Sequence, residues 1–160
     1  MENIKQFLIE AKKNTYANSK VLKTQSSRLG SEDYHYDGFV NGKKASYHDT
    51  YFGGERFIGE EIVYLEDKPV WGMNYYGYAL VAQFYEDAIK KVLRPALLNV
   101  ERSSLPLRGP NRFQTKDYIY TFESSGTLEN FSGIEKIFKN NQLIYELRCS
   151  GGKIKRRTMF

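Results

Sequence analysis

The chain has 160 residues, which is the size of one ordinary domain that can bury a hydrophobic core without disulfides. Aromatic residues make up 15% of it, and 13 residues are tyrosines. The formal charge of +5 favours a nucleic-acid partner only weakly, because much of the surplus lies in a basic tail at residues 153–160. A single cysteine, the absence of a signal-peptide pattern and the absence of a long apolar run predict a cytoplasmic protein with no membrane partner.

The first half of the chain is expected to contain one helix followed by strands. Residues 3–16 carry apolar side chains at helical spacing, at Ile4, Phe7, Leu8 and Ala11. Residues 18–28 form a polar linker that could order over a site. The Asn41-Gly42 turn signal predicts a hairpin between strands near 34–40 and 44–52. Two further strands are expected at 57–64 and 70–76, joined by a turn.

The second half repeats this order of elements. Residues 78–93 carry a wide apolar face and are expected to form a second helix, which Pro95 ends or kinks. Residues 105–112 are rich in proline and glycine and are expected to form a loop. Strands are expected at 118–124, 131–138 and 143–150, with Asn140-Asn141 as a turn.

An internal repeat links the two halves. Residues 57–77 align without a gap with residues 131–151, and the identical positions pair Phe57, Gly59, Glu61 and Gly77 with Phe131, Gly133, Glu135 and Gly151. This pattern predicts two copies of a helix–three-strand unit, at about 3–77 and 78–152, within a single domain. The expected fold class is α+β, with antiparallel sheet and two main helices, similar to duplicated effector-binding domains in which two half-units surround a cleft.

Both copies place a glutamate on the apolar face of a strand. Side chains alternate along a strand, so Glu61 shares a face with Phe57, Gly59 and Val63, and Glu135 occupies the matching position. A carboxylate in such surroundings has to be paired, hydrogen-bonded or protonated. Two interpretations remain open: each glutamate pins the fold through backbone amides or an arginine, or it serves a functional site.

The first copy also collects most of the polar aromatic residues. Aromatic rings around a carboxylate can hold an organic cation or a planar molecule, so we expect a ligand-binding cleft there. Glu61 would be its charge partner, Trp71, Tyr75 and Tyr51 its walls, and Glu55, Arg56 and Asn74 its orienting groups, with Tyr34 beside them. The alternative is an aromatic core with surface tyrosines.

Other chemistry finds weaker support. His35 and His48 lie on adjacent expected strands near aspartates, but they lack the spacing of a metal motif, so no metal and no cofactor is expected. Cys149 is expected in the core. A small hydrolase could use Glu61 with Glu55 or Glu135, and a nucleic-acid- or protein-binding accessory domain could use the basic end of the chain.

Several motifs resemble one uncharacterised bacterial family. They are the runs at 51–63 and 69–77, Leu107-Arg-Gly-Pro110 and Phe131-Ser-Gly-Ile-Glu135, and the resemblance extends over about 7–152. The family is a domain of unknown function, whose members occur alone or C-terminal to helix-turn-helix domains in transcriptional regulators. The resemblance implies a sensor domain and supplies no catalytic residues. This chain has no room for a helix-turn-helix, so we expect it to signal otherwise or to sequester its small-molecule ligand.

Overall fold

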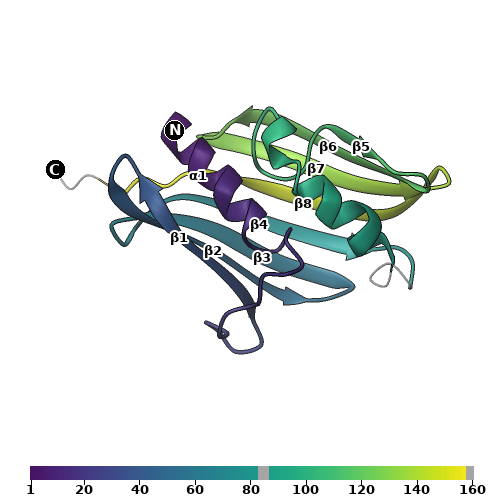
Figure 1. Cartoon of the computed structure of the whole chain (residues 1–160), viewed down its shortest axis with the longest axis horizontal. Coiled ribbons are helices and arrows are strands. Elements are labelled where there is room, and N and C mark those ends of the chain that lie inside the picture. Colours follow the sequence, from purple (N-terminus) through teal and green to yellow (C-terminus); the bar gives the residue numbers. More distant parts are fainter. Residues whose placement is uncertain (83–86, 158–160) are drawn as a thin grey trace.

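The computed structural model describes residues 1–82 and 87–157. Its elements are, in chain order, α1 (Glu2–Lys13), β1 (Glu32–Val40), β2 (Lys43–Gly53), β3 (Arg56–Leu65), β4 (Lys68–Ala79), the π-helical turn η1 (Ile89–Leu93), α3 (Arg94–Leu97), the 3-10 turn η2 (Val100–Arg102), β5 (Arg112–Gln114), β6 (Tyr118–Thr127), β7 (Asn130–Lys139) and β8 (Gln142–Lys153). The strands form one antiparallel sheet in the order β1-β2-β3-β4-β8-β7-β6-β5. Helix α1 and the second helical segment, residues 87–102, lie over the same face of this sheet (Figure 1). The α+β class expected from the sequence is therefore confirmed.

A long pairing between β4 and β8 joins the two halves of the sheet. It runs from the Trp71–Lys153 pair to the Ala79–Tyr145 pair, so the halves form one continuous sheet. The backbone N–H of Ile154 extends it by bonding to the carbonyl of Val70, 2.9 Å away. The basic end of the chain, which starts at Lys153, therefore begins within the sheet.

The strands β2–β4 and β6–β8 share several local features. Each set has a register shift at the same point, between Val63 and Tyr64 and between Ile137 and Phe138. The turns that follow these shifts both use two non-glycine residues with positive φ, namely Glu66 and Asp67 in one half and Asn140 and Asn141 in the other. Each half has four strands, one more than the expected unit, because β1 and the short β5 flank the repeated strands.

The second helix begins later than the sequence predicts. Tyr78 and Ala79 belong to β4, because both have partners on β8 and Tyr78 also pairs with Arg56 on β3. Residues 83–86 lie outside the described part of the chain, and helical backbone is described from residue 87. Of the two expectations for Pro95, an end or a kink, the end is not observed: helix continues to Leu97 after a wide π turn in which the N–H of Arg94 bonds to the carbonyl of Ile89.

The core lies between the helices and the sheet face that they cover, here called the covered face. Strand alternation sends the apolar and aromatic side chains of all the long strands to this side, where they meet α1 and the second helical segment. The opposite, open face carries mostly polar and half-exposed side chains. In residues 1–82 and 87–157, no helix combines the length and the apolar character needed to cross a membrane.

Candidate functional site

A cavity of about 360 Å³ lies between the covered face and the second helical segment. Strands β2, β3, β4 and β8 supply its floor, and the linker after α1 and the helical segment supply its roof. We call it the aromatic cavity, and its lining residues are Tyr16, Lys23, Glu32, Asp49, Tyr51, Gly53, Gly54, Phe57, Tyr75, Ile89, Lys90, Leu93, Arg94, Arg108 and Tyr145.

Five aromatic rings form most of the wall. Tyr16 meets Tyr51 edge to face, with ring centroids 6.3 Å apart. Phe57 packs at 6.1 Å from Tyr75 and stacks nearly parallel on Tyr145 at 6.2 Å. Such contacts fix the orientation of the rings, so the wall is preformed.

Two glycines of the repeated motif make room for these rings. A Cβ atom on Gly59 would lie 2.5 Å from the Tyr75 ring, and one on Gly77 would lie 2.3 Å from the Phe57 ring. Both distances are far below a van der Waals contact. The glycines are therefore needed at these positions so that Tyr75 and Phe57 can lie flat against the neighbouring strand.

One carboxyl group is buried at the floor of the cavity. The Tyr75 hydroxyl donates a hydrogen bond of 2.6 Å to Asp49, which is 5% exposed. Burial, and next the negative charge of Glu61 opposite it on β3, raise the pKa of Asp49 to about 7. The carboxyl group is therefore partly protonated at neutral pH.

The two repeated glutamates are each held by a buried cation. Glu61 pairs with Lys12 of α1. Glu135 receives two hydrogen bonds from the Arg108 guanidinium, of 2.9 and 2.8 Å, and further ones from Tyr120 and Tyr145. Of the three states expected for these carboxylates, namely paired, hydrogen-bonded or protonated, the structure shows ion pairing for both and further hydrogen bonds for Glu135. Because removing one member of a buried pair leaves an uncompensated charge, both pairs tie the helices and loops to the sheet.

The roof of the cavity presents a cation with no carboxylate partner. The Arg94 guanidinium lies 4.8 Å from the centre of the Tyr16 ring. Within the described part of the chain, Arg94 forms no ion pair, and its buried Nε has no hydrogen-bond partner. Burial raises the pKa of Tyr34, and the nearby Arg94 opposes this through its charge and a hydrogen bond. Arg94 is thus close to tyrosines but not neutralised.

The mouth of the cavity carries a smaller polar cluster. Lys23 pairs with Glu32, and Glu32 also accepts a hydrogen bond of 2.9 Å from the Tyr51 hydroxyl. Lys23 lies over the Tyr51 ring. Burial raises the pKa of Tyr16 to about 12 and also raises that of Tyr51, so both hydroxyls stay neutral and can donate hydrogen bonds.

Of the eight residues predicted for a ligand site, the structure places Tyr51 and Tyr75 on the cavity wall. Tyr34 is buried behind Tyr16, at 6.1 Å between ring centroids. Glu61 lies one layer deeper, where it and Lys12 line a separate small void of about 20 Å³. Tyr34 and Glu61 are neighbours of this wall, but of the predicted residues only Tyr51 and Tyr75 line the aromatic cavity.

The other four lie elsewhere. Trp71 is fully buried in the core, where it stacks on Phe131 and donates a hydrogen bond of 3.0 Å to the carbonyl of Leu128. Asn74 is on the open face and accepts a hydrogen bond from Ser150. Glu55 is exposed in the turn before β3, and Arg56 is exposed at the start of β3.

Sequence reasoning missed most of the cavity residues. Asp49 lies two residues from Tyr47 and from Tyr51 on β2 and therefore shares their face, so its face could have been assigned from the strand pattern. Phe57 was visible as a matched position of the repeat. Arg108 was visible only as part of the motif Leu107-Arg-Gly-Pro110, and no local pattern shows that the helical segment carries Arg94 over the sheet.

The histidines and the cysteine offer no competing site in the described residues. His35 and His48 contact each other edge to face, and His35 lies 2.8 Å from Asp37. No group of three or more metal-ligating side chains occurs within 1–82 and 87–157. Cys149 is buried, and burial raises its thiol pKa to about 12, which opposes a role as nucleophile.

Comparison with known proteins gives one match. The model of a family described as "Domain of unknown function (DUF5680)" matches residues 49–154, from Asp49 at the floor of the cavity to the residue after β8. No curated protein and no solved structure matches the chain.

Proposed function

The chain belongs to the family of the domain of unknown function DUF5680, and we propose that it is a small-molecule-binding domain. The observation that carries this proposal is the aromatic cavity: a preformed hollow whose walls are rings and whose polar groups are few and fixed. A volume of about 360 Å³ falls in the range typical of ligand sites in proteins. The ligand would be planar, with its body between the rings of Tyr51, Phe57 and Tyr75.

Differences between the halves support a site on one side only. On β2 and β4, Asp49 and Tyr75 occupy the positions that Phe122 and Cys149 occupy on β6 and β8, as the pairings with Glu61, Gly59, Glu135 and Gly133 show. Phe122 fills the space over Gly133, where an added Cβ would lie 2.6 Å from its ring. We therefore propose that the chain is a duplicated unit, like the effector-binding domains, in which one half is packed solid and the other binds ligand.

A sensor role follows from where the roof of the cavity comes from. Ile89, Leu93 and Arg94 belong to the helical segment, so a bound ligand would contact the sheet and a helical element at once. Ligand contacts that differ between two positions of that element would shift its equilibrium. We propose that the domain reports ligand binding in this way to a regulatory partner.

The hydrolase alternative has less support. Glu61 and Glu135 are each paired with a buried cation, and Glu55 is exposed, so none of the carboxylates considered for acid–base catalysis faces the aromatic cavity. The accessory-domain alternative relies on the basic end of the chain. In its described part, residues 153–157, this end consists of the exposed last residue of β8 and the exposed residues after it.

A fluorescent probe tests the proposal. N-phenyl-1-naphthylamine is uncharged at neutral pH and carries a flat naphthyl ring, and its emission rises in apolar surroundings. We expect it to bind the wild-type chain saturably, and Ile89→Trp, which fills the cavity from its roof, to abolish binding. Leu98→Trp is the matched control, because Leu98 is exposed and outside the cavity. Equal binding to Ile89→Trp and Leu98→Trp, or no binding to the wild type, would contradict the proposal.

A further inference from the structure

We propose that the ligand is an organic anion, a planar aromatic carboxylate whose carboxylate group binds Arg94. This inference rests on the proposed small-molecule function and names the chemical class of its ligand. Four observations support it: a guanidinium with no carboxylate partner among the described residues, the pairing of the other cations, the hydrogen bonding of the carboxyl groups, and the shape of the walls.

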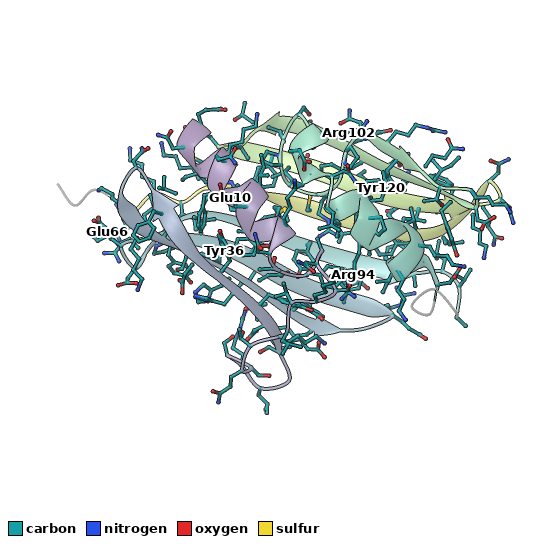
Figure 2. All side chains as sticks on the ribbon, in the orientation of Figure 1. Glu10, Tyr36, Glu66, Arg94, Arg102 and Tyr120 are labelled. Atoms are coloured by element: carbon teal, nitrogen blue, oxygen red, sulfur yellow. The ribbon has the colours of Figure 1, made fainter. Side chains whose placement is uncertain are left out.

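Arg94 is positioned as a binding group and not as a structural one. It begins α3, and Figure 2 labels it where the second helical segment passes over the sheet. Its guanidinium lies over the Tyr16 ring, with the guanidinium carbon 4.8 Å from the ring centroid, and Arg94 lines the cavity. A guanidinium presents five N–H donors in a planar fork that matches a carboxylate. Among the described residues Arg94 hydrogen-bonds to Tyr34 and pairs with no carboxylate, so its fork has further donors for a ligand.

The two buried cations near the cavity already have partners, whereas Arg94 is half-buried. Lys12 pairs with Glu61, and Arg108 forms two hydrogen bonds with Glu135. Lys23 at the cavity mouth pairs with Glu32, and Lys90 is exposed at the rim. Arg94 therefore differs from Lys12 and Arg108 in lacking a carboxylate within the described structure. Among the described residues no carboxylate takes this role, which leaves it to a ligand.

The carboxyl groups of the cavity do not balance this charge. Glu32 is occupied by Lys23 and the Tyr51 hydroxyl. Asp49 accepts the hydrogen bond of Tyr75, and the nearby charge of Glu61 disfavours its ionisation. An organic cation, the class that a free Glu61 would favour, would meet a positively charged roof and no available carboxylate. An anion would instead complete the Arg94 site.

The walls select a flat apolar body for the rest of the ligand. Phe57 and Tyr145 stack nearly parallel, Tyr75 meets Phe57 at an angle, and Ile89 and Leu93 close the cavity from above. Ring faces and edges of this kind pack well against a fused or substituted aromatic ring. A compact inorganic anion would leave these walls unfilled, so the arrangement favours an aromatic acid.

Three probes with the same ring separate charge from shape: 2-naphthoate, 2-naphthamide and 2-naphthylmethylamine, which are negative, neutral and positive at pH 7. Each displaces N-phenyl-1-naphthylamine if it enters the cavity. For the wild type we expect 2-naphthoate to bind at least about tenfold more tightly than the amide, with the amine weakest. Arg94→Gln should bring 2-naphthoate to within about threefold of the amide.

Arg102→Gln is the matched control, because Arg102 is an exposed arginine of the same helical segment and does not line the cavity. Thermal unfolding of both variants without ligand checks that they are folded. Equal binding of amide and naphthoate by the wild type would overturn the inference while leaving the proposed function intact. So would a naphthoate preference that survives in Arg94→Gln or falls equally in Arg102→Gln. If no naphthyl probe and no N-phenyl-1-naphthylamine binds, the proposed function itself fails.

Discussion

The hydroxyl of Tyr75 donates a 2.6 Å hydrogen bond to the buried carboxyl group of Asp49, and this pair forms the floor of the aromatic cavity. Two adjacent strand pairings bring the residues together, since Asp49 lies opposite Glu61 and Tyr75 lies opposite Gly59 on the strand between them. The polar floor is therefore a consequence of sheet register.

The stability of the domain should depend on pH through Asp49. Burial and the charge of Glu61 raise its pKa to about 7 in the folded chain, whereas an unfolded aspartate titrates near ~3.9. The folded state then binds more protons than the unfolded state between these values, so this contribution is fully present below about pH 4 and is lost as pH rises to 7. Asp49→Asn keeps a hydrogen-bond acceptor for Tyr75 and should flatten the pH slope, by on the order of 3–4 kcal/mol across the range.

Urea unfolding at several pH values from 4 to 8 measures this difference. The relevant quantity is the change in unfolding free energy between the wild type and Asp49→Asn at each pH. A constant difference across the range would show that Asp49 does not titrate in the folded chain.

Substituting Glu135 should cost more stability than a surface change on the neighbouring strand. Glu135→Gln leaves the buried Arg108 guanidinium without its charge partner, and breaking such pairs costs about 3–5 kcal/mol. Glu123→Gln on β6 alters an exposed carboxylate and should change stability by less than about 0.5 kcal/mol. Chemical denaturation of the two variants at pH 7 gives both values, and similar values would show that the pair does not hold the fold.

A methyl group at Gly59 should disrupt the cavity wall. In Gly59→Ala the new Cβ would lie 2.5 Å from the Tyr75 ring and 2.7 Å from the carbonyl oxygen of Thr50, which forces Tyr75 away from Asp49. Overpacking of this kind costs about 1–3 kcal/mol. Gly54 lines the same cavity, and a Cβ atom there would have no heavy atom within 4 Å. Gly54→Ala should therefore leave the unfolding midpoint nearly unchanged. Thermal unfolding compares them, and an equally tolerated Gly59→Ala would show that the ring can be accommodated elsewhere.

The fluorescence of Trp71 should report on the core and not on the cavity. Its side chain is fully buried, stacked on Phe131 and hydrogen-bonded to Leu128. We expect blue-shifted emission that iodide does not quench until the chain unfolds. Strong quenching of the folded protein would mean that the indole is accessible. Trp71→Phe should lower stability by about 1–3 kcal/mol through the lost hydrogen bond and ring area.

The fold was largely accessible from the sequence where local patterns decide structure. Alternation located the long strands to within a few residues, and the turn residues Asn41-Gly42 and Asn140-Asn141 located two hairpins. Tyr78 and Ala79 were assigned to a helix because their apolar neighbours fit a helical period, but hydrogen bonds to β8 keep them in the sheet. That competition between local pattern and sheet pairing is decided by tertiary contacts.

The site was less accessible, because it depends on position along the strands and on irregular connections. Trp71 and Tyr75 share the covered face of β4, yet four residues of strand separate them by about 13 Å, which puts one in the core and the other in the cavity wall. Asp49 and Arg94 meet the same cavity from distant parts of the chain. The sequence pattern indicated that Glu61 has to be paired, hydrogen-bonded or protonated, but it assigned the charge to a ligand and did not identify Lys12 as the partner.

Mapping of amide chemical shifts by NMR with 2-naphthoate tests the central claim most directly. Binding in the aromatic cavity predicts that the changes in amide chemical shift cluster at residues 49–54, at the end of β2 and the turn after it. Further changes are expected on β4 around Tyr75 and in the helical segment at 89–94. The open face offers a different groove of about 740 Å³, lined by residues that include Asn74, Ser132 and Ser150. Shifts confined to that groove, or no shifts at all, would contradict the account.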